Sequence, residues 1–174
     1  MRINDFKGQL ADGGARPNQF EVNINFPFGG PSGQAQLLVS GAALPASTVN
    51  PVITQYRGRE VKFAGERIFD PWTITVINSA EMSLRGAFEN WMDEINNRDD
   101  NGGILDWATY QSDILVTHLD RNDAPLKNGK YVLKDAFPIN MSEIALQYAQ
   151  NDIIEEYTVT FQYQTYEISS GSQF

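Results

Sequence analysis

The stretch that decides the fold is "AGERIFDPWTITVIN", residues 64–78. From Trp72 onward, apolar side chains alternate with polar ones, which predicts a β-strand with one buried face. Proline fixes φ and has no N–H, so Pro71 is suited to a strand entrance, and we expect Asp70 to cap the turn before it. The strand therefore begins sharply, and Trp72 is its first expected anchor in the core.

Similar strand patterns lie on both sides of this stretch. "QFEVNINFPF" (residues 19–28) alternates clearly, and the apolar run "AQLLVSGAAL" (residues 35–44) follows a Gly/Pro turn. Two further strands are predicted in "DILVTHL" and "KYVLKDAFPI". The longest predicted strand is "DIIEEYTVTFQYQTYE" (residues 152–167), with Phe161 on its apolar side. "PASTVNPVITQYRG" (residues 45–58) reads as an irregular segment, and "REVKFAG" after it as a short strand.

One segment has helical periodicity. In "SAEMSLRGAFENWMDEINN" the apolar residues recur at steps of three and four, with Phe88 and Trp91 in the stripe. This predicts one α-helix over about residues 80–97, capped by Asn78 or Ser79. Many strands and one helix in 174 residues predict a single, mainly β domain, an antiparallel β-sandwich or barrel with a flanking helix.

Composition narrows the classes of function. The net charge is −9, and residues 135–174 hold six of the 22 acidic residues and none of the 13 basic ones. Such an acidic chain is poorly suited to grip nucleic acid, although DNA can slide past an acidic surface. Cysteine is absent, which excludes disulfides and thiol chemistry and favours a reducing cytoplasm. The first residues have no apolar run of the secretory kind, and no run is long enough to cross a membrane as a helix.

Motifs for chemistry are weak. His118 is the one histidine, and no nucleophile or orienting carboxylate is marked for it, so a structural role is favoured. "NRDDNGG" matches the first half of a calcium loop, but Ala108 stands where the loop needs a bidentate glutamate, so a helix-ending turn is favoured. The Gly-rich stretches lack a phosphate-binding ending. We therefore expect no enzyme, no cofactor and no metal site.

The order of these features resembles the tail-tube proteins of contractile-tailed bacteriophages. That family has Arg-Pro-Asn before its first strand, Ala-Leu-Pro before a long loop, and a basic strand leading through Ala-Gly-Asp/Glu-Arg and Phe-Asp to a Trp-Thr-x-Thr-Val strand and a helix. The resemblance is strongest over residues 15–98, and Pro71 departs from it. The matching positions are Arg16 to Asn18, Ala43 to Pro45, Ala64 to Arg67, Phe69, Asp70, Trp72 to Val76, Arg85, Phe88 and Trp91.

The resemblance implies a structural virion protein, assembled in the host bacterial cytoplasm. It implies hexameric rings that stack into the hollow inner tube of a contractile tail, through which genomic DNA passes without sequence-specific binding. The implied partners are the tail sheath protein, a baseplate initiator, a tail terminator and a tape-measure protein. Subunits of type VI-like or bacteriocin injection tubes share this plan and are the alternative reading.

The resemblance also assigns roles to segments. Residues 1–15 form an N-terminal arm, residues 46–58 a ring-stacking loop and residues 168–174 a flexible tail. Candidates in the ring-stacking loop are Thr48, Val49, Asn50, Val52, Gln55, Arg57 and Arg59, and the basic ones would meet the acidic C-terminal region of an adjacent ring. Candidates for the lumen are Glu21, Asn23, Asn25, Lys62, Thr158, Thr160 and Gln162. The expected core anchors are Trp72, Phe88, Trp91 and Phe161.

Two other classes of function stay open on the residues alone. A β-sandwich module for carbohydrate would expose aromatic side chains on one sheet face, and Tyr163, Tyr166 and Trp107 are its candidates. A hydrolase would depend on His118 without a marked partner.

Overall fold

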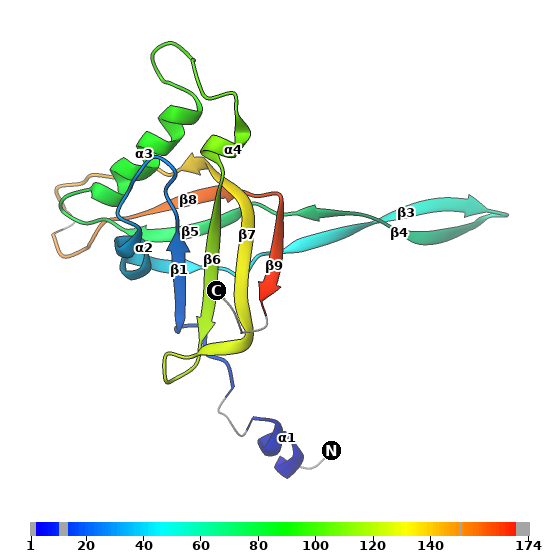
Figure 1. Ribbon diagram of the computed structural model, residues 1–174. Coiled ribbons are helices and arrows are strands. Elements are labelled where there is room, and N and C mark those ends of the chain that lie inside the picture. The colour runs from blue at the N-terminus through cyan, green and yellow to red at the C-terminus, as the bar shows by residue number, and fades with distance from the viewer. Residues whose placement is uncertain (1–2, 11–13, 150, 170–174) are drawn as a thin grey trace.

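A computed structural model describes residues 3–10, 14–149 and 151–169 of the chain (Figure 1). It is mainly β, as predicted. The strands are β1 (Phe20–Ile24), β2 (Val39–Ala42), β3 (Ser47–Tyr56), β4 (Arg59–Phe69), β5 (Trp72–Ile77), β6 (Ser112–Leu119), β7 (Pro125–Met141), β8 (Glu156–Gln162) and β9 (Thr165–Ser169). The helices are α1 (Ile3–Gln9), α2 (Ser32–Leu38), α3 (Ser83–Ile95) and the single turn α4 (Trp107–Tyr110). No helix of the described ranges is long and apolar enough to span a membrane.

All recorded strand pairs are antiparallel. Seven strands form one sheet in the order β1-β6-β7-β8-β5-β2, with β9 paired to β7 beside this path. Strand β7 is long enough to pair with two strands in succession. Its residues Lys130–Lys134 pair with β9, and its residues Phe137–Met141 pair with β8. The sheet therefore folds over along β7 into two layers, and β1–β6 faces β5–β8 across the core.

The core between the layers is aromatic at its centre. Phe161 lies 5.8 Å from Trp72, 5.9 Å from Phe88 and 6.2 Å from Trp91, measured between ring centroids. All four side chains are buried. The indole N–H of Trp91 donates to the Tyr110 carbonyl at 2.7 Å, so this buried ring has its polar partner.

The helices differ from prediction in detail. α3 begins at Ser83 rather than near residue 80, because a turn closed by the Met82 N–H on the Ser79 carbonyl precedes it. Met82 occupies the N-cap position with φ 51°, and neither predicted cap is used. No helix was predicted over α2, whose first residues were expected in the Gly/Pro turn and whose last residues in the apolar run after it. These seven residues form a helix, because Ala35 packs into the core beside β1 while Leu37 stays exposed.

The C-terminal strand prediction was wrong in length. The apolar side of Tyr157, Val159, Phe161 and Tyr163 is buried as predicted, but the strand begins only at Glu156 and breaks before Thr165, where β9 begins. The longest strand is β7, whose bend includes Asp135 with φ 55°. Of the predicted mobile tail, Ile168 and Ser169 belong to β9, and residues 170–174 lie outside the described residues.

The segment predicted to be irregular is instead half of a long hairpin. β3 and β4 pair over their whole length and project from the body as the hairpin arm, residues 47–69 (Figure 1). Its eleven-residue strand β4 spans about 36 Å at roughly 3.3 Å per residue. Pro51 is tolerated because this ribbon has no third strand in the described chain, so a missing N–H costs no ladder bond on its outer edge.

Candidate functional site

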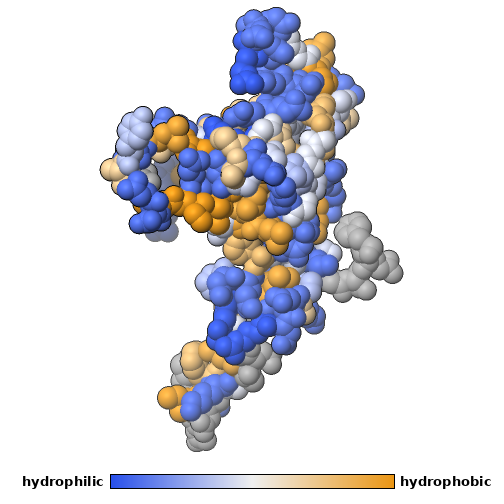
Figure 2. Space-filling model, turned by 90° about the vertical axis from the view of Figure 1, so that its left-hand side faces the viewer, coloured by the Kyte–Doolittle hydropathy of each residue, from blue (hydrophilic) through white to orange (hydrophobic). Residues whose placement is uncertain are grey.

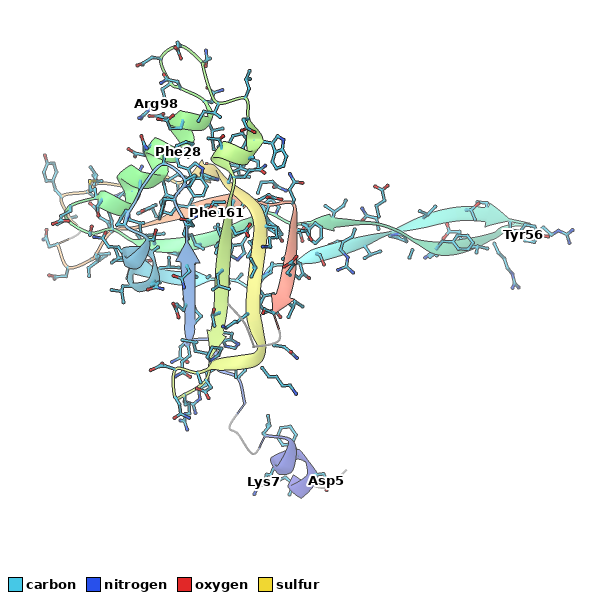
Figure 3. All side chains as sticks on the ribbon, viewed as in Figure 1. Asp5, Lys7, Phe28, Tyr56, Arg98 and Phe161 are labelled. Atoms are coloured by element: carbon cyan, nitrogen blue, oxygen red, sulfur yellow. The ribbon has the colours of Figure 1, made fainter. Side chains whose placement is uncertain are left out.

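The hairpin arm is a continuation of the β2–β5 pair. Ala42 pairs with Ile74 at the end of the β2–β5 ladder, and Ser47 pairs with Phe69 at the start of the β3–β4 ladder. Five residues separate the two pairs on both sides, so the register is the same in the two ladders. The arm is therefore joined to the body through both of its strands in step. Tyr56 marks its far tip and Phe161 the core of the body (Figure 3).

Hydrogen bonds fix the root of the arm. The Trp72 indole N–H donates to the Ala43 carbonyl at 2.5 Å. The Ala46 carbonyl accepts both the backbone N–H of Asp70 at 3.3 Å and the Tyr163 hydroxyl at 3.2 Å. The backbone N–H of Asp70 thus continues the pairing of β3 with β4 by one bond.

Aromatic rings close the root on the other side. Phe69 lies 5.9 Å from Tyr163 and 5.7 Å from Tyr166, and Tyr166 lies 6.1 Å from Tyr131. Burial raises the pKa of Tyr163, and the neighbouring Tyr166 and Asp70 raise it further, so its hydroxyl keeps its proton as a donor. These tyrosines hold the arm in place and are not displayed on an open sheet face.

A bulge lies part-way along the arm. The pairing shifts between Val49 and Pro51, where Gly65 and Glu66 of β4 lie opposite Asn50. A Cβ added at Gly65 would meet the Asn50 carbonyl oxygen at 2.5 Å, so only glycine fits. The glycine of the Ala-Gly-Glu-Arg stretch is therefore required by the backbone of the bulge. A bulge of this kind increases the local twist of the ribbon.

Beyond the bulge, the two faces of the arm differ. One face carries an exposed apolar strip, in which Val52 is 55%, Phe63 58% and Tyr56 63% exposed. Val61 shares this strip because Thr54, between Val52 and Tyr56 on the same face, pairs with it. The opposite face mixes Ile53 with polar and charged neighbours, among them Gln55, Glu60 and Lys62.

All seven ring-stacking candidates lie on this arm. Thr48, Val49 and Asn50 are near its root, Val52 and Gln55 lie on opposite faces of the distal half, and Arg57 and Arg59 are at the tip. Arg57 forms the turn with φ 48°, and its guanidinium stacks 5.5 Å from the centroid of the Tyr56 ring.

The lumen candidates are divided among three surfaces. Thr158, Thr160 and Gln162 lie on the outer side of β8, where Thr160 meets Thr73 of β5 at 2.9 Å between hydroxyl oxygens. We call this outer side, made by Thr73, Thr75, Thr158, Thr160 and Gln162, the polar β5–β8 face. It consists of neutral hydroxyl and amide groups.

The other lumen candidates lie elsewhere. Glu21 and Asn23 are on β1, where the Gln36 amide of α2 donates to both side chains, to Glu21 at 2.7 Å. This network ties α2 to the sheet and covers part of that face. Asn25 is exposed just after β1, and Lys62 lies on the hairpin arm.

His118 and the "NRDDNGG" turn have structural partners. A ring nitrogen of His118 lies 2.8 Å from the Arg16 carbonyl and attaches the N-terminal segment to β6. In the turn, the Asn97 and Asp100 side chains accept backbone N–H groups of Asp99 and Gly102, each at 2.8 Å. The described residues contain no group of three metal-ligating side chains.

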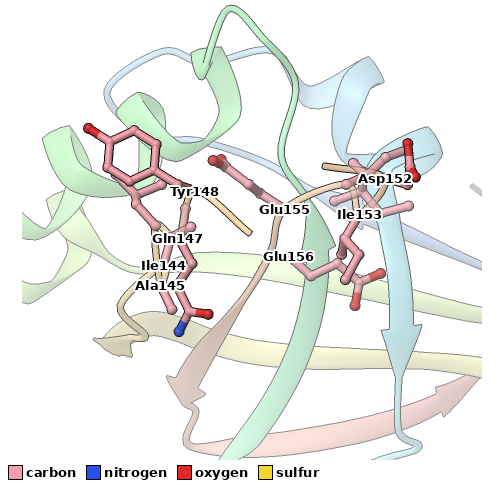
Figure 4. Close-up of a pocket in the computed structure, with 11 residues that line it drawn as sticks. Ile144, Ala145, Gln147, Tyr148, Asp152, Ile153, Glu155 and Glu156 are labelled. Carbon is pink, nitrogen blue, oxygen red and sulfur yellow. The ribbon is translucent and has the colours of Figure 1, made fainter. Parts of the chain in front are cut away.

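The sequence reasoning missed one surface. Residues 143–155 lie between β7 and β8. An open hollow of about 1060 Å³ is lined there by residues 144–148, residues 152–156 and Ile77 (Figure 4). Leu146, Ile153 and Ile154 are exposed there, at 80%, 68% and 70%. The sequence pattern did not mark this surface, because Ile153 and Ile154 fall within a segment predicted to be a strand.

Comparisons with known proteins agree on one family. The chain matches the family model described as phage tail tube protein over residues 15–169. It is 28% identical over 167 residues to the tail tube protein of Serratia phage KSP90, covering 92% of this chain and 93% of the relative. It is 30% identical over 153 residues to tail tube protein gp19 of Enterobacteria phage T4, covering 84% and 86%.

Two solved structures share the fold. One is a chain of the tube-terminating cap of the anti-feeding prophage, with a TM-score of 0.67 and 14% identity, covering 91% of this chain and 92% of that chain. The other is a chain of the PVC sheath-tube complex of an extracellular contractile injection system in its extended state, with a TM-score of 0.57 and 14% identity, covering 93% and 97%.

Proposed function

Because the chain belongs to the phage tail tube protein family, structural and non-enzymatic proteins of contractile phage tails, we propose that six copies close into a ring and that the rings stack into the hollow inner tube of the tail. The tube conducts genomic DNA during delivery. The observation that carries this proposal is the hairpin arm, which protrudes from the body with an apolar strip exposed.

The hairpin arm has features that are unfavourable in an isolated subunit. A two-stranded ribbon is marginal in water, and exposed apolar strips and open strand edges promote association. The hydrogen bonds at its root hold it extended all the same. An arm built to reach a neighbouring copy explains both features, and we assign it to contacts between rings, with Arg57, Arg59 and Lys62 meeting acidic groups of the C-terminal region.

The polar β5–β8 face is our choice for the lumen. Its neutral hydroxyl and amide groups hydrate well and offer phosphate no cation to bind, so DNA can slide along them. Placing β5 and β8 at the bore also puts the arm, which continues β5, at an end of the lining strands. Glu21 and Asn23 are bonded to α2 and are weaker candidates.

The outer partners are inferred from relatives. Solved chains of the same fold come from a sheath-tube complex and from a tube-terminating cap, and we propose that this chain likewise binds a sheath and a terminator. A baseplate initiator and a tape-measure protein complete the proposed set. The carbohydrate-binding alternative is not supported, because its candidate aromatic residues do not form one exposed surface. Tyr163 is only 2% exposed, and Trp107 lies away from it on α4.

Negative-stain electron microscopy of the purified chain, alone and seeded with its tail initiator, tests the proposal. We expect six-fold rings or tubes with a central hole. The double substitution V52D/F63D should leave the monomer folded, since both side chains are exposed, and should abolish tubes. The control L105D/N122D places two charges on exposed side chains of the body, away from the arm, and should assemble. A wild-type chain that stays monomeric with its initiator present would refute the assignment.

A further inference from the structure

The hollow beside Ile77 has two walls from one loop. Ile144 to Tyr148 form one wall and Asp152 to Glu156 the other, and the side chains line the space between them (Figure 4). The inner sides offer aliphatic and aromatic groups to solvent. At about 1060 Å³, the hollow is large enough to take several side chains of another protein.

The charge of the hollow is one-sided. Asp152, Glu155 and Glu156 line it, and none of the described residues that line it is Lys or Arg. The sequence has no basic residue anywhere from position 135 to its end, so the loop and the strands that follow it supply no neutralising charge. A partner that fills this hollow therefore has an apolar surface with basic residues at its margin.

The tip of the hairpin arm has that chemistry. Tyr56 and Val61 end the apolar strip, and Arg57 and Arg59 stand at the turn. Arg57 is already stacked on the Tyr56 ring, which presents an aromatic face and a guanidinium as one unit. Arginine binds carboxylates in pairs of hydrogen bonds, so acidic groups at the margin of the hollow suit it.

The tip and the hollow lie at opposite ends of one copy. β5 starts at Trp72, beside the root of the arm, and ends at Ile77, which lines the hollow. Figure 1 shows the arm and the 143–155 loop pointing away from each other, and Figure 2, which faces the end of the molecule opposite to the arm, shows a hollow with hydrophobic and hydrophilic side chains around it. The tip of a copy cannot reach its own hollow.

We propose that the hollow of one copy receives the arm tip, residues 56–61, of a second copy. The contact is head-to-tail, so it leaves one free tip and one free hollow at the ends of any pair and propagates through an assembly. This inference rests on the proposed tube, and it specifies where the arm docks.

Site-directed crosslinking tests the docking, and the chain suits it because it contains no cysteine of its own. A copy with Gln55→Cys near the tip is mixed with a copy carrying Gln147→Cys in the hollow, and a short bismaleimide is added. We expect a dimer between the two variants at a yield at least tenfold above a matched mixture in which Asn122→Cys, in the β6–β7 turn, replaces the hollow position.

Charge exchange separates docking from folding. R57E/R59E should lower the crosslink yield at least tenfold, and combining it with D152R/E156R on the partner copy should restore most of it. Tubes that form without the tip-to-hollow crosslink would overturn this inference and leave the tube proposal intact. Crosslinked pairs without tubes would support the docking and count against the tube. A chain that yields neither would overturn both.

Discussion

Replacing Trp72 with phenylalanine should loosen the root of the hairpin arm before it harms the rest of the fold. Phenylalanine keeps a ring against Phe161 but removes the indole donor of the Ala43 carbonyl. Because Ala43 is exposed, water can replace that donor, and the loss is about 0.5–1.5 kcal/mol. The deleted atoms leave a cavity of about 40 Å³, which costs about 1 kcal/mol more. The free energy of unfolding should fall by about 1.5–2.5 kcal/mol, within the roughly 5–15 kcal/mol of an ordinary domain.

Two measurements check this prediction. Urea denaturation followed by circular dichroism gives the change in free energy of unfolding, with Trp107→Phe as the control, since that side chain is 60% exposed and should change stability by about 0.5 kcal/mol at most. Hydrogen exchange of the Asp70 amide, which donates to the Ala46 carbonyl, reports on the root directly. We expect this amide and the amides of the arm to exchange faster in W72F.

Two results would contradict this role for Trp72. If W72F destabilised the chain no more than W107F, the indole hydrogen bond and its packing would contribute little. If stability fell while exchange at Asp70 stayed at the wild-type rate, Trp72 would be a core residue without a role in holding the arm.

Three other predictions concern the body. The Tyr157 hydroxyl is buried with no hydrogen-bond partner in the described chain, and burial raises its pKa to about 12, against about 10 when unfolded. The folded chain therefore holds a proton that the unfolded chain releases, so stability should be complete below pH 10 and should fall between pH 10 and 12, by roughly 2–3 kcal/mol in all. Y157F should remove this part of the pH dependence in denaturant titrations. Gly86→Ala, in α3 with open space around it, should raise the melting temperature through a gain of up to about 1 kcal/mol in helix propensity. Gly30→Ala should lower stability by about 1–3 kcal/mol in urea denaturation, because its Cβ would lie 2.7 Å from the Phe26 ring; equal stability of the two alanine variants would contradict this packing.

Most of the body could be predicted from the period of its apolar residues. The alternation after Trp72 and around Phe161 gave the right buried faces, because one side of each strand meets the core. α3 was predicted for the same reason, with a period of three to four. α2 was missed because seven residues with two leucines fit a buried strand as well as a helix, and only its packing beside β1 decides.

The hairpin arm shows why the rest could not be predicted. Its strands alternate poorly, since both faces carry apolar and polar side chains, and Pro51 reads as a strand breaker. A ribbon with no core of its own has no burial pattern to display. Its role as a contact was expected from a family resemblance, and its shape had to come from the structure.

The candidate surfaces were predictable in unequal measure. Trp72, Phe88, Trp91 and Phe161 were named from spacing alone and are buried. The lumen candidates were named only as polar positions of strands, and polarity does not distinguish the face bonded to α2 from the face between β5 and β8. The hollow depends on the path of a loop, for which sequence patterns give no rule.

The unbroken register from β2 into β3 sets a rule for how such an arm can change in length. Adding one residue to each strand would turn the apolar strip to the opposite side of the ribbon, whereas adding two would restore it. Viable arms therefore differ by whole pairs of residues, in steps of about 6.6 Å. The distance between the two surfaces that the arm connects can then change only in steps of two residues along each strand.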